Sequence, residues 1–414
     1  MMKYLLKISF FSLCTCFNSY TMIFDNRYFP LFQRPLTRHS NKLSNFFVQA
    51  DFISSSQAYD DQEKVIPLFQ IDGGYDQIQL LKSVLKVYPT KAFASDFIRS
   101  DMLVNTPAIP WDHNGRIDTQ LINVRYSQAL TPYIILGVDT LFAHINSHKK
   151  ARLDHKKITV SPGDFEEILK GDAQLHSFLK LSSAQYDTLS WGDTDISLRL
   201  GNRWEYKAKF KAIDAGCTFG VIAPTARSRS LFNPASIPLG GNGHWGLYGS
   251  LDADFNLKED WRAILLLRVQ KRLPKTSVQR VPVGLEPLSY GALLAPTRVN
   301  PGFTFIAMPT IILDGLRDNF GIQVAYTLVV HRQDCWSDQR NDKAVEGLFN
   351  RAEHFSAWGS EYVTIGLNYD YSRDLECPRV ANRAGLLVDI PLNYAVAKQS
   401  VKNIRISLSM ESNF

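Results

Sequence analysis

Apolar and polar residues alternate along most of the chain after its N-terminal segment. In the stretch 404–411, every even position is isoleucine, leucine or methionine and every odd position is polar. Successive side chains of a β-strand point to opposite faces, so this period of two predicts strands with one apolar and one polar face. Twelve stretches carry the pattern: 45–53, 119–127, 132–142, 194–203, 209–222, 244–255, 261–272, 303–313, 319–331, 358–371, 383–396 and 402–413.

The segments between these strands are alternately short and long. The short ones are 128–131, 204–208, 256–260, 314–318 and 372–382, and the long ones are 54–118, 143–193, 223–243, 273–302 and 332–357. Up-and-down barrels of outer membranes have short turns at the periplasmic end and long loops at the outer end. A β-sandwich has no reason to collect its long loops on one rim. The spacing therefore predicts an all-β fold, an antiparallel up-and-down transmembrane β-barrel of about twelve strands.

Two of the long segments contain short helices by their apolar spacing. In 75–88, Ile78, Leu81 and Leu85 fall on one helical face, and a second helical stretch occupies 164–169. An apolar helix in an outer loop must cover something. The sequence leaves two hypotheses open: the helices cap or plug the lumen, or they pack against the rim.

Two prolines fall inside predicted strands. Pro309 and Pro391 lack the backbone N–H that a strand paired on both sides would donate. A β-bulge would take each proline out of the ladder, so we expect a bulge at both positions.

Composition excludes several classes of protein. Hydrophobic residues make up 45% of the 414 residues and charged residues 21%, unlike a disordered or low-complexity chain. The mean hydropathy is −0.15, and no apolar run beyond the N-terminus approaches the roughly 18–20 residues of a membrane-spanning helix. The formal net charge of +6 is not concentrated in a basic stripe, so we expect no nucleic-acid partner.

The N-terminus indicates export. Lys3 and Lys7 come before the apolar stretch 8–17, which is the arrangement of a secretory signal peptide. The chain then divides into a signal peptide (1–20), a periplasmic N-terminal segment (21–43) and an outer-membrane barrel (44–414), in which 54–118 is a long loop that plugs or caps the barrel.

Without the signal peptide, three cysteines remain, Cys217, Cys335 and Cys377. An odd number with no close pair argues against a disulfide framework. The topology predicts that Cys217 points outward, that Cys335 lies in an outer loop and that Cys377 lies in a periplasmic turn.

Candidates for chemistry are few. His144 and His148 have the spacing of two ligands on one helix face, but they fall where a strand should end. A barrel phospholipase would need serine and histidine on the lipid-facing surface near the outer rim, and no spacing singles out Ser228, Ser360 or His331 for that role. We therefore expect no enzymatic activity, no cofactor and no metal.

The end of the chain resembles Gram-negative outer-membrane β-barrel proteins. Phe414 shares a strand face with Ile406, Leu408 and Met410, and this looks like the C-terminal assembly signal of that class. The resemblance implies an outer-membrane location, with membrane lipid and the barrel-assembly machinery as partners. Aromatic residues near predicted strand ends fit the girdles of such barrels: Trp204, Trp245, Trp261, Phe303, Phe320, Trp358 and Tyr394.

Three short motifs carry a narrower resemblance. Trp-Gly-Asp at 191–193, Gly-Val-Ile-Ala-Pro-Thr at 220–225 and Gly-Gly-Asn-Gly at 240–243 are similar to transporter-like barrels of the phenol-degradation group, which are loosely akin to the long-chain fatty-acid channel. This resemblance implies uptake of hydrophobic or aromatic compounds.

Placing the apolar faces toward lipid determines which charged residues face the lumen. One arginine on the lipid face near the bilayer midplane would cost about 2–4 kcal/mol, so the polar faces must point inward. They could form ion pairs that rigidify a narrow barrel or a field that filters solutes, and both can hold. The expected lumen-lining, selectivity-determining residues are Arg199, Arg262, Arg268, Arg272, Asp252, Asp254, Arg405 and Glu411.

The sequence thus predicts a passive outer-membrane channel for small-molecule solutes, in which loops 54–118 and 143–193 restrict the pore and lumen charges filter the solute. The alternative is a structural or adhesive surface barrel with a closed lumen, whose long loops bind partners. A barrel phospholipase is the third hypothesis.

Overall fold

The computed structural model describes residues 26–29, 43–89, 108–154, 162–182, 184–206, 211–257, 260–317, 319–372 and 380–414. The expected signal peptide, most of the expected periplasmic segment and Cys377 lie outside the described residues.

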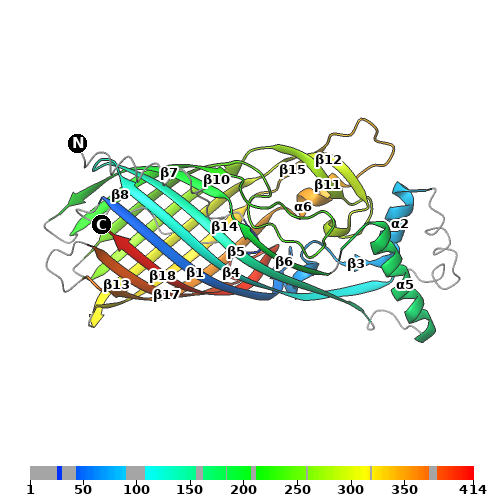
Figure 1. The fold of residues 1–414 in the computed structure, drawn as a ribbon, viewed down its shortest axis with the longest axis horizontal. Helices are drawn as coiled ribbons and strands as arrows, with labels where there is room; N and C mark the ends of the chain where they lie inside the picture. Colours follow the sequence, from blue (N-terminus) through cyan, green and yellow to red (C-terminus); the bar gives the residue numbers. More distant parts are fainter. Residues whose placement is uncertain are drawn as a thin grey trace, which may run out of the picture.

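Twelve antiparallel strands close into a barrel (Figure 1). Each strand pairs with the next one along the chain, and β1 pairs with both β4 and β18, which closes the ring. The predicted fold is confirmed, and each of the twelve predicted stretches overlaps one of these strands. The strands are β1 (Ser44–Tyr59), β4 (Pro110–Ala129), β5 (Ile134–Leu153), β7 (Thr194–Glu205), β8 (Ala212–Ala223), β9 (Gly246–Asn256), β10 (Trp261–Arg272), β13 (Phe303–Arg317), β14 (Phe320–His331), β16 (Trp358–Asp370), β17 (Ala381–Leu392) and β18 (Ser400–Asn413).

The two ends of the barrel differ. Short turns and the C-terminus lie at one end, which the length rule identifies as periplasmic, and the long segments gather at the other, outer end (Figure 1). The helix predicted at 75–88 is α2, and the stretch 164–169 belongs to the longer α5. The outer segments form β2 (Val65–Pro67), η1 (Leu68–Gln70), β3 (Tyr75–Asp76), α2 (Gln77–Val87), α5 (Pro162–Phe178), β6 (Gln185–Trp191), β11 (Lys275–Val281), η2 (Leu288–Tyr290), β12 (Leu293–Asn300), β15 (Cys335–Asp338) and α6 (Phe349–His354).

Large apolar side chains cover the outer face of the barrel at alternate positions. On β18, Ile404, Ile406, Leu408 and Met410 are each about half exposed, as is Phe414 at its end. Their neighbours along the strand point inward, so the register predicted from the sequence is confirmed. A continuous apolar exterior of this kind suits hydrocarbon rather than water.

The apolar band stops well below the outer ends of the two longest strands. On β4 the outward positions from 112 to 120 are all polar, and on β5 so are those from 144 to 150. Charged side chains at these positions would be costly in hydrocarbon, so 111–120 and 144–153 extend beyond the membrane. The strands predicted from the sequence, 119–127 and 132–142, are therefore too short at their outer ends. The outward face is polar there, so apolar and polar residues no longer alternate.

The expected bulges at the two prolines are wrong for the described strands. Pro309 lies opposite Leu265 of β10 in regular register, and pairing with β14 resumes in unchanged register at Thr310. The ladder between β13 and β14 opens there instead of shifting, which accommodates the missing donor. At Pro391 the register with β16 is also regular, and the ladder between β17 and β18 has already ended at Asp389.

Trp358 corrects the predicted aromatic girdle. It shares a strand face with the inward-pointing Tyr362, is 3% exposed and stacks on His331 inside the barrel with ring centroids 5.7 Å apart. Tyr394 is 89% exposed and lies in the connection between β17 and β18 at the outer end. The other five predicted girdle residues are exposed on the outer face.

A first apolar cluster, the lumen cluster, fills the outer half of the barrel interior. It joins inward side chains of the wall to η1 and to two segments outside the wall, 26–29 and 226–239. Phe69 of η1 packs so closely on β4 that a Cβ at Gly115 would come within 2.5 Å of its ring. The cluster consists of Tyr28, Phe29, Ile53, Ala58, Leu68, Phe69, Ile71, Ile117, Leu121, Leu141, Ala143, Ile145, Ala226, Ile237, Leu239 and Val401.

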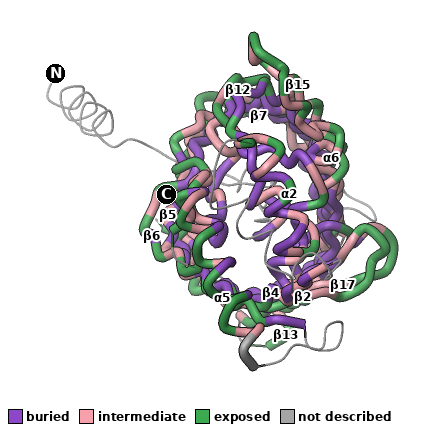
Figure 2. Tube along the Cα trace, turned by 90° about the vertical axis from the view of Figure 1, so that its right-hand side faces the viewer, coloured by how far each residue is buried: buried purple, intermediate pink, exposed green. Residues whose placement is uncertain are grey.

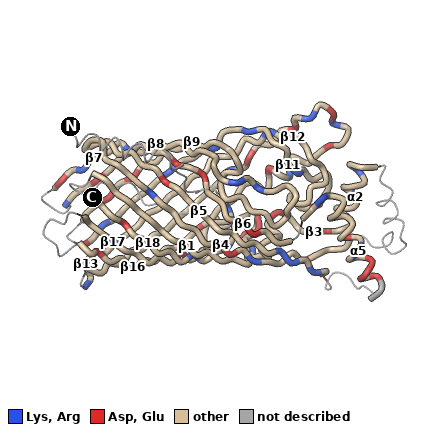
Figure 3. The backbone as a smooth tube through the Cα atoms, viewed as in Figure 1, with Lys and Arg blue, Asp and Glu red and all other residues tan. Residues whose placement is uncertain are grey.

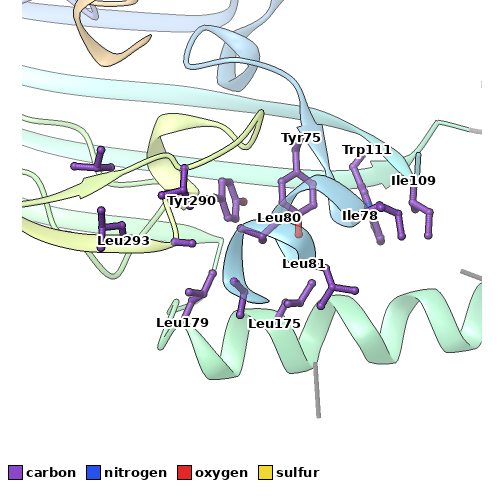
Figure 4. Close-up of a cluster of buried hydrophobic side chains, with 14 of the residues drawn as sticks. Tyr75, Ile78, Leu80, Leu81, Ile109, Trp111, Leu175, Leu179, Tyr290 and Leu293 are labelled. Carbon is purple, nitrogen blue, oxygen red and sulfur yellow. The ribbon is translucent and has the colours of Figure 1, made fainter. Parts of the chain in front are cut away.

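A second apolar cluster, the cap cluster, covers the outer end. Leu80, Leu81 and Val84 of α2 pack against Leu175 and Leu179 of α5 and its end (Figure 4). Trp111 of β4, Tyr290 of η2 and Leu293 of β12 complete the same cluster. Seen along the barrel from the outer end, α2 crosses the mouth and α5 lies beside it (Figure 2). Both helices thus lie at the outer end, and their role in restricting the lumen stays a prediction.

None of the helices in the described ranges is both long enough and apolar enough to cross a membrane.

Candidate solute path

The periplasmic half of the interior holds arginine–aspartate pairs. Nη2 of Arg199 on β7 lies 2.6 Å from Asp214 of β8 and 2.6 Å from Asp252 of β9, and the arginine side chain is 2% exposed. Arg268 of β10 lies 3.6 Å from Asp195. These residues lie on the inward faces of nearby strands, so each guanidinium is beside a carboxylate. The attraction between the two charges offsets the cost of burying them.

All eight predicted lumen residues face inward, and each makes a polar contact. Basic and acidic positions are distributed along the strands as well as over the outer loops (Figure 3). Besides Arg199, Arg268 and Asp252, the contacts are Arg262 with Asp254 (2.5 Å), Arg272 with Asp193 (2.8 Å), Arg405 with Asp389, and Glu411 with Asn45 (2.6 Å). Their role in selectivity stays a prediction.

A further ion pair inside the barrel was not predicted, although the alternation of the sequence points to it. Arg125 of β4 donates to Asp139 of β5 at 3.0 Å, and both side chains are buried. Arg125 lies between Val124 and Tyr126, which point outward, so the alternation alone already places it inside.

Residues 26–29 belong to the segment that we expected in the periplasm, yet they contact the outer half of the interior. Asn403 of β18 donates from Nδ2 to the backbone oxygen of Tyr28 at 2.8 Å. The backbone N–H of Val401 donates to the oxygen of Arg27 at 3.0 Å. Phe29 is 1% exposed. Together with η1, this segment occupies space that an open pore would leave to solvent.

A cavity of about 240 Å³ lies at the outer end, between residues 26–28, the segment after β8 and the segment after β14. Four arginines line it, Arg27, Arg229, Arg272 and Arg280. Asp72 lies between two of them, bonded to Arg27 and, at 2.9 Å, to Arg229. Burial would raise the pKa of Asp72, but the charges of Arg229 and Arg27 hold it below its usual range.

An aromatic stack lies beneath the cap, beyond the apolar band. The ring of His113 stacks on both Tyr75 (4.8 Å between centroids) and Tyr290 (5.5 Å), whose own centroids are 4.8 Å apart, and His176 stacks on the same Tyr290 at 5.5 Å. Nζ of Lys149 lies 4.4 Å from the centre of the Tyr290 ring. In the described part of the chain, neither ring nitrogen of His113 has a hydrogen-bond partner.

Burial suppresses positive charge in this stack. Burial lowers the pKa of His113 well below its usual value, and the charge of Lys149 adds to the effect. Burial also lowers the pKa of Lys149 to about 7, although Asp72 attracts its charge. The stack is therefore held together by neutral rings near pH 7.

The other candidate residues are not assembled into a site. His144 and His148 point outward from β5, and His144 bonds Asp187 at 2.8 Å. Inside the barrel, the His331 ring contacts Thr304 (2.8 Å) and Asp334 (3.0 Å). Ser360 also faces the interior, whereas a barrel phospholipase needs these groups on the lipid-facing surface.

The cysteines follow the predicted topology where they are described. Cys217 points outward from β8 and Cys335 begins β15 in an outer segment; both are free thiols.

No protein-family model and no curated protein sequence matches this chain. Among solved structures, it is similar to an outer-membrane channel from Pseudomonas putida F1, with 12% identity over 93% of this chain and 100% of that one and a TM-score of 0.52. A mutant of the monoaromatic hydrocarbon channel TodX has 10% identity over 90% and 91% of the two chains, with a TM-score of 0.36. The transport unit of the autotransporter AIDA-I from Escherichia coli has 7% identity over 94% and 95%, with a TM-score of 0.33. The first likeness shows the fold, which is that of an outer-membrane channel barrel, and the other two are too distant to add to it.

Proposed function

We propose that the protein is a passive channel of the outer membrane for small solutes, restricted by a plug that its own outer segments place in the lumen. The observation that carries this proposal is the lumen cluster. Leu68, Phe69 and Ile71, which are not part of the barrel wall, pack against inward side chains in its outer half, whereas the inner half holds arginine–aspartate pairs.

The plug can move without breaking the barrel. The segment η1 has three residues and packs mainly on β4 and β1 of the wall. The backbone hydrogen bonds of the wall run between strands and do not involve η1. Displacing the segment therefore costs apolar contacts but leaves the closed ladder intact.

The interior favours solutes with apolar surface. A solute that enters from the outer end meets the apolar lumen cluster before it reaches the arginine–aspartate pairs of the inner half. An apolar passage with few polar contacts is the usual lining of a site for weakly polar small molecules. This agrees with the hydrophobic or aromatic solutes that the sequence resemblance implies.

Liposome swelling tests the plug. The variant Leu68→Ala/Phe69→Ala/Ile71→Ala removes most of the apolar volume of η1, and we expect it to admit neutral sugars that are too large for the wild type. Val65→Ala on the adjacent β2, whose side chain is 47% exposed, is the matched control and should behave as the wild type.

Equal swelling of the triple variant and the wild type would contradict the plug. If neither protein passed any solute, the alternative of a structural barrel with a closed lumen would be favoured instead.

A further inference from the structure

The outer cavity carries more positive than negative charge at its wall. Four arginines line it against two carboxylates, Asp72 and Asp334, and one of the four, Arg272, is paired with Asp193 behind the wall at 2.8 Å. Asp334 accepts from the backbone of Gly302 at 2.7 Å and lies 3.0 Å from His331. Asp72 forms ion pairs with both Arg27 and Arg229. Its single negative charge can neutralise only one of these two positive charges.

Arg280 adds a positive charge that carbonyl groups solvate. Its Nη1 and Nη2 donate to the backbone oxygens of Gly291 (3.0 Å) and Leu179 (2.7 Å), and its Nε donates to that of Leu231. Within the described ranges, no carboxylate forms an ion pair with it. Burial lowers the pKa of Arg280 to about 10, so it remains charged at neutral pH.

Arg229 keeps part of its guanidinium available to the cavity. Only its Nη2 bonds a side-chain acceptor, Asp72, and its side chain is 25% exposed. Nε and Nη1 have no acceptor among the described residues. The N–H groups of Nε and Nη1 point in different directions, so each can donate a separate charge-assisted hydrogen bond to a carboxylate oxygen.

Aromatic rings form part of the remaining cavity wall, among polar side chains such as Asn242 and Gln279. Tyr28, Trp336, Phe355 and Trp358 line it, from three different parts of the chain. Their rings can cover the apolar body of a small molecule whose charged end lies at the arginines.

We infer that this cavity binds a small organic carboxylate, with the carboxylate accepting a charge-assisted hydrogen bond from one of the N–H groups of Arg229 that have no acceptor, and with the apolar body against the aromatic rings. This inference rests on the proposed function and names the class of solute that the channel collects at its outer end. The excess positive charge selects anions over neutral analogues, because removal from water strengthens the interaction between unlike charges.

Binding of benzoate and its uncharged counterpart benzamide to the refolded full chain tests the inference by titration calorimetry. We expect the wild type to bind benzoate more tightly than benzamide, and Arg229→Gln to raise the Kd for benzoate about tenfold or more, the loss expected for a charge-assisted hydrogen bond. Arg116→Gln, whose side chain is 64% exposed on the outer surface, should leave the Kd unchanged.

A second variant covers the case in which Arg229→Gln does not fold. Asp72→Asn removes the carboxylate that competes for Arg229 and keeps its shape, so we expect benzoate to bind several-fold more tightly, a gain that misfolding does not produce.

Two results would overturn the inference: equal affinity of the wild type for benzoate and benzamide, or no loss in Arg229→Gln. If Arg229→Gln does not fold, unchanged or weaker binding in Asp72→Asn would overturn it. Swelling by sugars without benzoate binding would refute this site alone, whereas benzoate binding without any swelling would refute the channel.

Discussion

Buried charges in this barrel are tolerated because they are paired. Arg199 contacts two carboxylates, Asp214 and Asp252, and is almost fully buried. Removing it leaves like charges next to one another in an enclosed interior, which costs more than losing the pair itself.

We therefore expect Arg199→Met to lower the free energy of unfolding by about 3–5 kcal/mol. Arg116→Met removes an exposed ion pair with Asp118 on the outer surface. It should lower the free energy of unfolding by at most about 1 kcal/mol. Urea unfolding in lipid vesicles, followed by tryptophan fluorescence, measures both. Equal shifts for the two variants would mean that the interior pair is no more important than a surface pair.

At the scale of residues, alternation predicts orientation but not partners. The parity of each strand correctly placed Cys217 outside and Arg268 inside. It could not pair Arg268 with Asp195, because the two residues are far apart in the sequence and meet only through the stagger of the closed barrel. Trp358 was predicted wrongly for a different reason. Its position near a strand end suggested an aromatic girdle, but the alternation along β16 places its side chain inside the barrel.

At the scale of elements, the cap is the part that should respond to pH. His113 lies buried among Tyr75, Tyr290, His176 and Lys149, and Asp172 is the carboxylate beside His176 and Tyr75. Burial raises the pKa of both tyrosines, so they remain neutral, and it lowers the pKa of His176, which the charge of Asp172 opposes.

The sign follows from proton uptake. When the cap opens, the pKa of His113 returns to about 6.5, so the open state binds more protons. The histidine contribution to cap stability is complete above about pH 6.5 and is lost as the pH falls below it. Lys149, with a pKa of about 7 in the closed cap, adds stability as the pH rises from about 7 toward its usual value near 10.4.

Hydrogen exchange of α2 amides measures this effect as protection factors at pH 8 and pH 5. We expect protection to fall at pH 5 in the wild type and to fall less in His113→Phe, which keeps the ring but cannot be protonated. Amides of β18 should keep their protection at both values. Equal protection of α2 at the two pH values in the wild type would contradict a cap held by neutral side chains.

The elements that the sequence could predict are those with a periodic environment. Strands facing lipid on one side and α2 with its single apolar face were found because their surroundings repeat along the chain. The outer ends of β4 and β5 extend beyond the lipid, so their outward faces are polar and the pattern disappears. The path of η1 into the lumen has no period, although the apolar residues at 66, 68, 69 and 71 between polar segments are a local signal of burial.

At the scale of the whole molecule, the barrel has a polar inner half, an apolar outer half and a cap. The wall supplies the charges of the inner half, and segments from outside the wall supply much of the outer half. From the periplasmic to the outer end, the chain therefore combines a lipid-facing wall with an interior that changes from charged to apolar.

The most direct test of that route is the current through single molecules of refolded protein in a planar bilayer under a KCl gradient. The account predicts discrete current steps, and it predicts that Arg262→Gln/Arg268→Gln shifts the reversal potential toward cation selectivity, because the interior loses two positive charges beside Asp254 and Asp195. Absence of steps from inserted protein, or a reversal potential that the double variant leaves unchanged, would contradict passage through the charged interior.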